Sequence, residues 1–122
     1  MAHQIAQALD YVGVIGVEFF VIGDELLVNE IAPRVHNSGH WTIDGADTSQ
    51  FEQHVRAICG WPLGSTARHS DAVMTNLLGD NANEWRSLLD EPLAHLHLYG
   101  KRDILPGRKM GHVTRTRPLR SR

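Results

Sequence analysis

Cysteine, lysine and long apolar runs are scarce in this chain, and each scarcity excludes a class of protein. The single cysteine, Cys59, cannot form an internal disulfide, which excludes a disulfide-stapled domain and favours a reducing, cytoplasmic compartment. No apolar run is long enough to span a membrane, and the N-terminus lacks the pattern of a signal peptide. We therefore expect a cytoplasmic globular chain.

The chain also lacks a large excess of positive or negative charge. The net charge of −2 gives no overall attraction to nucleic acid or to an anionic membrane, so neither is an expected partner. Lysine occurs only as Lys101 and Lys109, near the C-terminus. What is present is an ordinary globular composition, 42% hydrophobic and 21% charged over 122 residues, which is enough for a modest core.

The first half of the chain alternates helical and extended patterns. Helical spacing of apolar residues predicts a short helix over residues 2–11, and runs rich in Val, Ile and Phe on either side of Gly23 predict a β-hairpin. The segment 36–49 is rich in turn residues and should form an ordered loop. A helix over residues 50–60 should follow, capped by Thr48 or Ser49, and its expected inner face consists of Phe51, Val55, Ile58 and Cys59.

The second half has a different character. A strand at 72–79, a short helix at 83–90 capped by Asn81 or Asn83, an alternating strand at 94–100 and a last strand before a basic tail are expected. We therefore predict an α+β fold, with one domain over residues 1–64 and a small β-rich domain over residues 65–122.

Two acids in the predicted hairpin need an explanation. If the turn is centred on Asp24, three cross-strand pairs are expected, Ile22 with Leu26, Phe20 with Val28, and Glu18 with Glu30. Opposed residues share a face of the hairpin, so two carboxylates placed there repel each other. A divalent cation between them would remove the repulsion, and Mg²⁺ is held by carboxylates of this kind. The alternative is that either acid simply faces solvent at a sheet edge.

Polar residues follow the second acid closely. Arg34 could stabilise negative charge near a metal–phosphate site, or it could form a surface ion pair. His36 and Asn37 lie in a loop that could line a small ligand, or that could be a self-bonded turn. His36 and His40 lie four residues apart in a loop with no obvious third nitrogen or sulfur ligand, which argues against zinc.

Two long motifs carry a family resemblance. The stretch GVIGVEFFVIGDELLVNEIAPRVHNSGHWTIDGADTSQFEQHVRAICGWPLG resembles the C-terminal part of an ATP-grasp enzyme, the ATP-dependent carboxyaminoimidazole ribonucleotide synthetase, also called the ATPase subunit of phosphoribosylaminoimidazole carboxylase. The later YGKRDILPGRKMGHVT is similar to the C-terminal signature of that family. The resemblance implies an ATP-grasp portion, with an antiparallel hairpin sheet and helices, followed by a small β-rich domain.

The resemblance also implies a reaction and roles for residues. The family uses Mg-ATP and bicarbonate to carboxylate aminoimidazole ribonucleotide through carboxyphosphate. Glu18 and Glu30 would hold Mg²⁺, Asn29 with Glu30 would line the ATP site, and Arg34, His36 and Asn37 would face the intermediate or the ribonucleotide. Lys101 and Arg108 would grip the ribonucleotide phosphate, which suits a lysine and a guanidinium placed across a turn. A solvated basic tail is the alternative for that stretch.

Some features depart from the family. Position 32 is alanine where many ATP-grasp enzymes outside the purine branch carry a third ligand, and the chain has no glycine-rich phosphate loop and no lysine before residue 101. We therefore expect a fragment that lacks the N-terminal ATP-grasp lobes, is inactive alone and forms a homodimer through exposed apolar surface. The alternatives are a fragment of the formate-dependent glycinamide ribonucleotide transformylase and a non-catalytic binding or assembly module.

Overall fold

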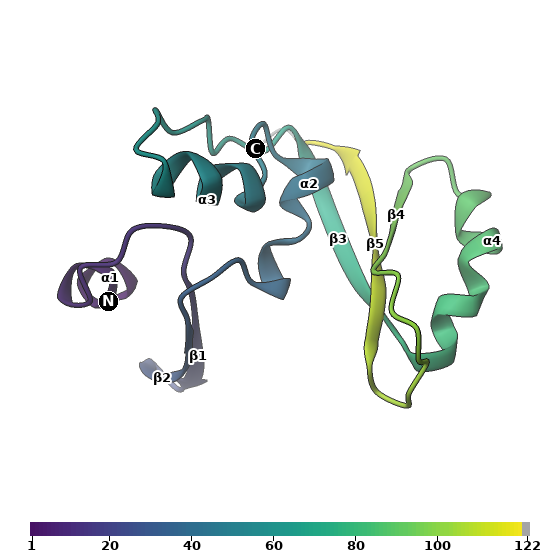
Figure 1. Ribbon diagram of the computed structural model, residues 1–122, viewed down its shortest axis with the longest axis horizontal. Helices are drawn as coiled ribbons and strands as arrows, with labels where there is room; N and C mark the ends of the chain where they lie inside the picture. Colours follow the sequence, from purple (N-terminus) through teal and green to yellow (C-terminus); the bar gives the residue numbers. More distant parts are fainter. Residues whose placement is uncertain (121–122) are drawn as a thin grey trace. The chain divides into compact units, whose positions relative to one another are not determined.

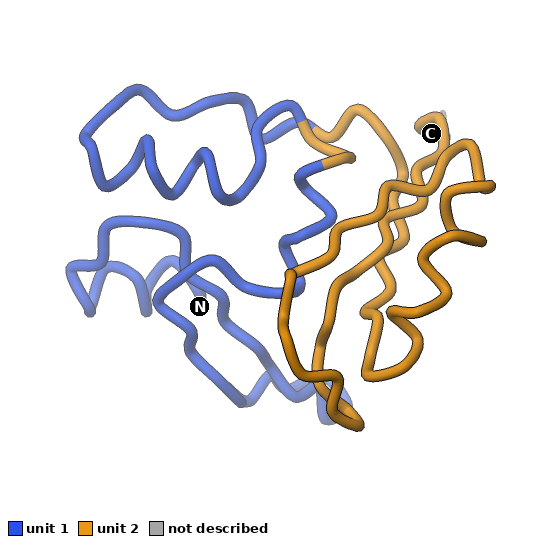
Figure 2. The backbone as a smooth tube through the Cα atoms, turned by 45° about the vertical axis from the view of Figure 1, so that its right-hand side comes forward, with its two compact units in different colours: residues 1–43, 47–67 blue, residues 44–46, 68–122 orange. Residues whose placement is uncertain are grey.

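The computed structural model describes residues 1–120, so the last two residues of the predicted second domain, Ser121 and Arg122, lie outside the described residues. The chain forms two compact units, which Figure 2 colours separately. Unit 1 comprises residues 1–43 and 47–67, and unit 2 comprises residues 44–46 and the chain from residue 68 onward.

Unit 1 is built around a two-stranded hairpin. It contains α1 (Ala2–Ala8), β1 (Gly16–Ile22), β2 (Glu25–Ala32), the 3₁₀ turn η1 (Asn37–Gly39) and α3 (Gln50–Ile58), while α2 (Thr42–Gly45) passes into unit 2 (Figure 1). The first helix ends three residues earlier than predicted, at Ala8, and the expected loop over residues 36–49 contains η1 and α2.

The hairpin has the predicted acid pair but a different turn. Gly23 and Asp24 alone form the turn, because Ile22 pairs with Glu25, and the partners of Phe20 and Val21 are each shifted by one residue from expectation. A bulge between Glu18 and Phe19 inserts Asn29 as an extra residue on β2 and restores the expected register, so Glu18 does face Glu30. The two predicted apolar pairs were therefore wrong, and the acid pair was right.

Helix α3 begins where the sequence predicts. The Ser49 Oγ accepts a hydrogen bond from the Glu52 backbone N–H at 3.2 Å, which is the expected N-cap. The predicted inner face was wrong, because its residues are exposed. The exposed fractions are 39% for Phe51, 46% for Val55 and 57% for Ile58, and Cys59 is exposed as well. The inward side of α3 is polar instead, because Gln50, Gln53 and His54 hydrogen-bond to loops of the same unit.

Unit 2 is a three-stranded antiparallel sheet with a short helical segment. Its elements are β3 (Ser70–Leu78), the 3₁₀ turn η2 (Gly79–Glu84), α4 (Trp85–Leu89), β4 (Ala94–Leu98) and β5 (Lys109–Pro118), and β5 lies between β3 and β4 (Figure 1). Because β5 is central, residues 110–114 are all buried, and Val113 joins Leu77 and Leu88 in the core. The predicted asparagine cap of α4 was wrong, since η2 leads directly into the helix and no side chain caps it.

The short segment 44–46 is attached to unit 2 by backbone hydrogen bonding. Ala46 forms an isolated antiparallel bridge with Arg68, and the His69 N–H donates to the Gly45 carbonyl at 3.0 Å. The last strand extends to Pro118, so part of the expected basic tail is β-structure. In the described part of the chain, no helix has the length and apolar character that crossing a membrane requires.

Candidate functional site

The acid pair lies at the bulge of the hairpin in unit 1. Glu18 and Glu30 are direct cross-strand partners, and their side chains are 45% and 52% exposed, respectively. The bulge turns the Asn29 side chain to the same side, where its Nδ2 donates to the Glu18 Oε2 at 3.3 Å. Three side chains that carry oxygen atoms therefore gather at the point where the ladder is interrupted.

His36 holds the other oxygen of Glu18. Its Nε2 lies 3.4 Å from the Glu18 Oε1, while its Nδ1 accepts from the Ser38 backbone N–H and lies 2.8 Å from the Ser38 Oγ. Because Nδ1 accepts, the proton of a neutral ring belongs on Nε2, which faces the carboxylate. Gly16 makes room for this ring, since a Cβ at that position would lie 2.9 Å from the Cβ and Cγ of His36.

Arg34 lies beside the second acid. Its Nη2 is 3.9 Å from the Glu30 Oε1, and its Nη1 donates to the Val35 carbonyl at 3.0 Å. The guanidinium side chain is 61% exposed, so the ion pair is a weak one and leaves the group accessible to an anion. Asn37, the other predicted ligand-facing residue, begins η1 directly after His36.

Sequence reasoning missed Gln50, which is buried beneath this loop. Its side-chain oxygen accepts from the His36 N–H at 3.0 Å, and its Nε2 donates to the His36 carbonyl at 2.8 Å. The available signal was a glutamine placed on the polar side of α3 together with Gln53 and His54. Such a pattern does not say which backbone group the amide will bind.

The two predicted phosphate residues lie in unit 2, in the loop between β4 and β5. Lys101 Nζ donates to the Lys109 carbonyl at 2.6 Å and lies 5.6 Å from the centroid of the Tyr99 ring. Arg108 Nη1 donates to the Asp103 carbonyl at 3.0 Å. Both cations thus contact neutral carbonyls of their own loop, and neither of these hydrogen bonds neutralises the charge. In unit 1, by contrast, the structure brings Glu18, Asn29, Glu30, Arg34 and His36 together.

Unit 2 also contains a histidine cluster, in which His112 is buried and its neighbours are partly buried. Asp44 Oδ2 lies 2.9 Å from His97 Nε2, the rings of His97 and His112 stack with centroids 4.6 Å apart and planes 16° apart, and Tyr99 OH lies 2.8 Å from His112 Nδ1. Burial also raises the pKa of Tyr99. The three potential ligand atoms of Asp44, His97 and His112 lie within 4.8 Å of one another. However, a metal must lie near the plane of each imidazole, and two stacked rings do not offer one position that satisfies both.

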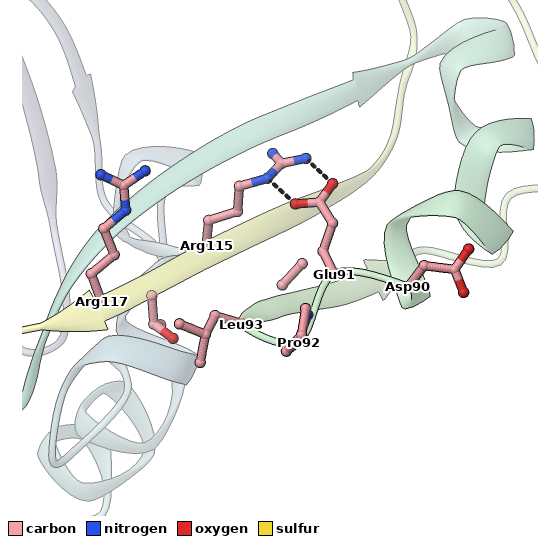
Figure 3. A pocket seen from close by; sticks show the side chains of 8 residues that line it. Asp90, Glu91, Pro92, Leu93, Arg115 and Arg117 are labelled. Carbon is pink, nitrogen blue, oxygen red and sulfur yellow. Dashed lines mark hydrogen bonds and ion pairs between the residues drawn. The ribbon is translucent and has the colours of Figure 1, made fainter.

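A shallow pocket lies at the far end of β5 in the same unit (Figure 3). Arg115 closes one side of it through a bidentate pair with Glu91, with distances of 2.6 and 2.7 Å. This hydrogen bonding lowers the pKa of Glu91 and raises that of Arg115. The Arg115 guanidinium is therefore already neutralised by Glu91 and offers an anion little.

Comparisons with known proteins agree with the motifs. The family model of the ATP-grasp domain matches residues 1–51, and that of the phosphoribosylaminoimidazole carboxylase C-terminal domain matches residues 72–121. The N5-carboxyaminoimidazole ribonucleotide synthase of Brucella melitensis is 59% identical over 118 residues, which cover 96% of this chain and 33% of that protein.

Solved structures give the same result. The synthetase of Thermus thermophilus is 55% identical with a TM-score of 0.85, over 95% of this chain and 32% of that structure. The synthase of Aspergillus clavatus in complex with ADP and 5-aminoimidazole ribonucleotide is 43% identical with a TM-score of 0.81, over 88% of this chain and 31% of that structure. The family resemblance and the α+β fold class are thus confirmed, and the chain spans about a third of the length of these relatives.

Proposed function

Starting from the resemblance to the carboxyaminoimidazole ribonucleotide synthases, we propose that this chain carries the metal-binding and ribonucleotide-phosphate-binding part of such an ATP-dependent ligase. The reaction would use ATP and bicarbonate to carboxylate aminoimidazole ribonucleotide through carboxyphosphate. The observation that carries the proposal is the pairing of Glu18 with Glu30 at a bulge, because two opposed carboxylates destabilise a hairpin unless a cation joins them.

The donor set at the bulge suits Mg²⁺. Glu18 and Glu30 carry carboxylate oxygens, which are the hard ligands that Mg²⁺ prefers, and the Asn29 amide donates to one of them. Both acids are about half exposed, which leaves room for water and phosphate oxygens to complete the coordination. The bound ion would bring nucleotide phosphates to the hairpin and neutralise their charge.

The residues next to the hairpin would serve the substrate side. Arg34 is an accessible cation beside Glu30, so it suits the role of stabilising negative charge on carboxyphosphate. His36 presents its Nε2 toward Glu18, and with Asn37 it would face the intermediate or the ribonucleotide. Lys101 and Arg108 would hold the ribonucleotide phosphate, exchanging carbonyl partners for phosphate oxygens with which charge-assisted hydrogen bonds are stronger.

The metal part can be tested on the chain itself. Mn²⁺ replaces Mg²⁺ at oxygen sites and broadens NMR signals nearby, so titrating Mn²⁺ should broaden the amide signals around Glu18 and Glu30 first. Glu30→Gln should weaken this binding strongly. The matched control is Glu25→Gln, at the opposite end of β2, which should leave it unchanged. Uniform broadening in all three proteins would refute a hairpin metal site.

The reaction is tested by ADP release from Mg-ATP, aminoimidazole ribonucleotide and bicarbonate. The chain is assayed alone and then mixed with a separately made N-terminal part of the Thermus thermophilus relative. Activity only in the mixture would support both the ligase assignment and the expectation that the isolated chain lacks part of the active site. No activity in a verified complex would favour the non-catalytic assembly module instead. The names of the matching relatives favour the synthase over the transformylase.

We also propose a homodimer. Apolar side chains of the hairpin are widely exposed, among them Val21 at 72% and Ile22 at 58%, and such surface favours association. Sedimentation of the chain over a range of concentrations would detect the dimer, and a monomer at every concentration would refute it. The cytoplasmic location stays a prediction from the sequence, and the single cysteine supports it.

A further inference from the structure

The Gln50 amide binds the backbone of His36 on both sides. Its Oε1 accepts from the His36 N–H at 3.0 Å, and its Nε2 donates to the His36 carbonyl at 2.8 Å and to the His40 Nδ1 at 2.7 Å. The His36 N–H can only donate, so the orientation of the amide is fixed and each of its hydrogen atoms has an acceptor. One side chain therefore holds both histidines of the HNSGH loop.

The loop is shaped around this amide. Gln50 is only 8% exposed, and a Cβ on Gly39 would lie 2.5 Å from its Oε1, so the loop can pass over the amide only with glycine at position 39. The backbone N–H of Gln50 donates to the Thr42 Oγ1 at 2.9 Å, and this hydroxyl donates to the Gly39 carbonyl. Buried amides that satisfy every donor and acceptor make a loop rigid.

The position of this loop also affects the Glu18 carboxylate, which is a proposed metal ligand. His36 Nε2 and Asn29 Nδ2 lie beside the two oxygens of Glu18, one each, so the direction of this carboxylate depends on where the His36 ring lies. The ring position in turn depends on the His36 backbone, which Gln50 holds. We propose that Gln50 is a positioning residue that orients His36 and, through it, the Glu18 carboxylate for metal binding. The metal half of this statement rests on the proposed function.

The same helix offers a matched control. Gln53 makes the equivalent pair of hydrogen bonds to Gly64, whose carbonyl accepts from the Gln53 Nε2 at 2.7 Å and whose N–H donates to its Oε1 at 2.9 Å. Gln53 is also on α3 and partly buried, but its partner loop carries none of the proposed ligands. Replacing either glutamine by leucine removes the same kind of two-sided clamp. A purely structural role predicts similar consequences for both.

The experiment compares Gln50→Leu with Gln53→Leu in the whole chain. The first readout is the ¹⁵N shifts of the His36 ring, which report the tautomer and do not depend on any metal. The wild type and Gln53→Leu should show the Nε2-protonated ring, and Gln50→Leu should show a mixture of tautomers. The second readout is Mn²⁺ affinity, which should fall about tenfold in Gln50→Leu, as for other residues that orient ligands, and stay within about twofold in Gln53→Leu.

A double-mutant cycle with His36→Ala tests whether Gln50 affects metal binding through His36. If Gln50 acts through His36, Gln50→Leu should have no further effect on Mn²⁺ affinity once His36 is alanine. Should Gln50→Leu unfold the chain, Gln50→Glu replaces it, because the carboxylate still accepts from the His36 N–H but cannot donate to the His36 carbonyl. It should likewise mix the tautomers.

The outcomes separate the two proposals. An unchanged His36 tautomer in Gln50→Leu or Gln50→Glu would overturn the positioning role. Equal Mn²⁺ affinities in the two leucine variants would overturn the claim that Gln50 affects metal binding through His36. Additive effects of Gln50→Leu and His36→Ala would overturn it as well. If the wild-type chain binds no Mn²⁺ at all, the metal site of the proposed function fails, and the ring shifts still decide whether Gln50 positions His36.

Discussion

Replacing Glu18 by glutamine should stabilise the chain when no divalent cation is present and remove the stabilisation that such a cation gives. Glu18 and Glu30 are opposed across the hairpin, and opposed residues have Cβ atoms about 5 Å apart. If the two carboxylates keep this separation, their unit charges repel in water by about 0.8 kcal/mol, and physiological salt reduces this to about half. Glutamine removes the repulsion and keeps an oxygen that can accept from Asn29.

One contact opposes this gain. The His36 Nε2 lies 3.4 Å from Glu18 Oε1, a distance at which a hydrogen bond is weak, so its loss offsets only a few tenths of a kcal/mol. At low ionic strength the variant should therefore be more stable than the wild type by roughly 0.5 kcal/mol. With Mg²⁺ at ten times its dissociation constant the order should reverse, because binding stabilises the wild type alone by about 1.4 kcal/mol.

Urea unfolding in EDTA and in Mg²⁺ measures both effects. Glu25→Gln is the control, since Glu25 lies at the turn end of the hairpin opposite Ile22 and should respond to neither condition. The reasoning would be refuted if Glu18→Gln destabilised the chain in EDTA, or if Mg²⁺ stabilised the wild type and Glu18→Gln equally. The first result would mean that the two carboxylates are not in conflict. The second would place any bound ion elsewhere.

Further predictions concern the supports of the two units. Gly39→Ala should destabilise the chain by about 1–3 kcal/mol in thermal unfolding, because its Cβ would overlap the Gln50 amide, and Gln50→Ala should relieve much of this loss. The hydrogen bond from Arg115 lowers the pKa of Glu91 in the folded chain. This carboxyl therefore stabilises the fold above its unfolded pKa, and the stabilisation is lost as the pH falls through its folded pKa. Glu91→Gln should accordingly lose less stability on acidification than the wild type. Asp44→Ala should cost about 1–3 kcal/mol in urea unfolding, because it removes the mostly buried carboxylate that hydrogen-bonds to His97.

Each of these has an outcome that would contradict it. Equal losses for Gly39→Ala in the wild-type and Gln50→Ala backgrounds would show that the amide is not the obstacle. If the wild type and Glu91→Gln lost the same stability on acidification, the ion pair between Arg115 and Glu91 in Figure 3 would not persist in solution. A neutral Asp44→Ala would mean that the backbone bridges of residues 44–46 suffice to hold this segment.

The hairpin shows how sequence reasoning can reach a correct contact by an incomplete route. A turn centred on Asp24 and the observed turn with its bulge give the same partner for Glu18 and different partners for Phe20 and Ile22. Runs rich in Val, Ile and Phe predicted the strands, but both sides of this ribbon are apolar, so the pattern could not fix the register. The bulge depends on the geometry at Asn29, for which the sequence carries no local signal.

Helix α3 shows the opposite failure. Its apolar stripe predicted the buried side, following the rule that such a stripe faces a core, but the stripe is exposed in the described chain and the glutamines face inward. An amide that binds the backbone of a residue fourteen positions earlier is a tertiary contact, and neither periodicity nor helix propensity encodes it. Long-range polar contacts of this kind are what composition and spacing leave undetermined.

The opposed acids and the buried amide have one explanation in common. Local rules disfavour both features, since like charges face each other on one element and a fully polar group is buried under another. The two features are explained together. The Gln50 amide fixes the backbone of His36, and His36 and Asn29 flank the Glu18 carboxylate. A carboxylate held in one direction can bind an ion with little loss of conformational freedom. A sequence selected for stability alone would need neither feature. Both departures from local preference converge on Glu18, the carboxylate for which metal binding is proposed.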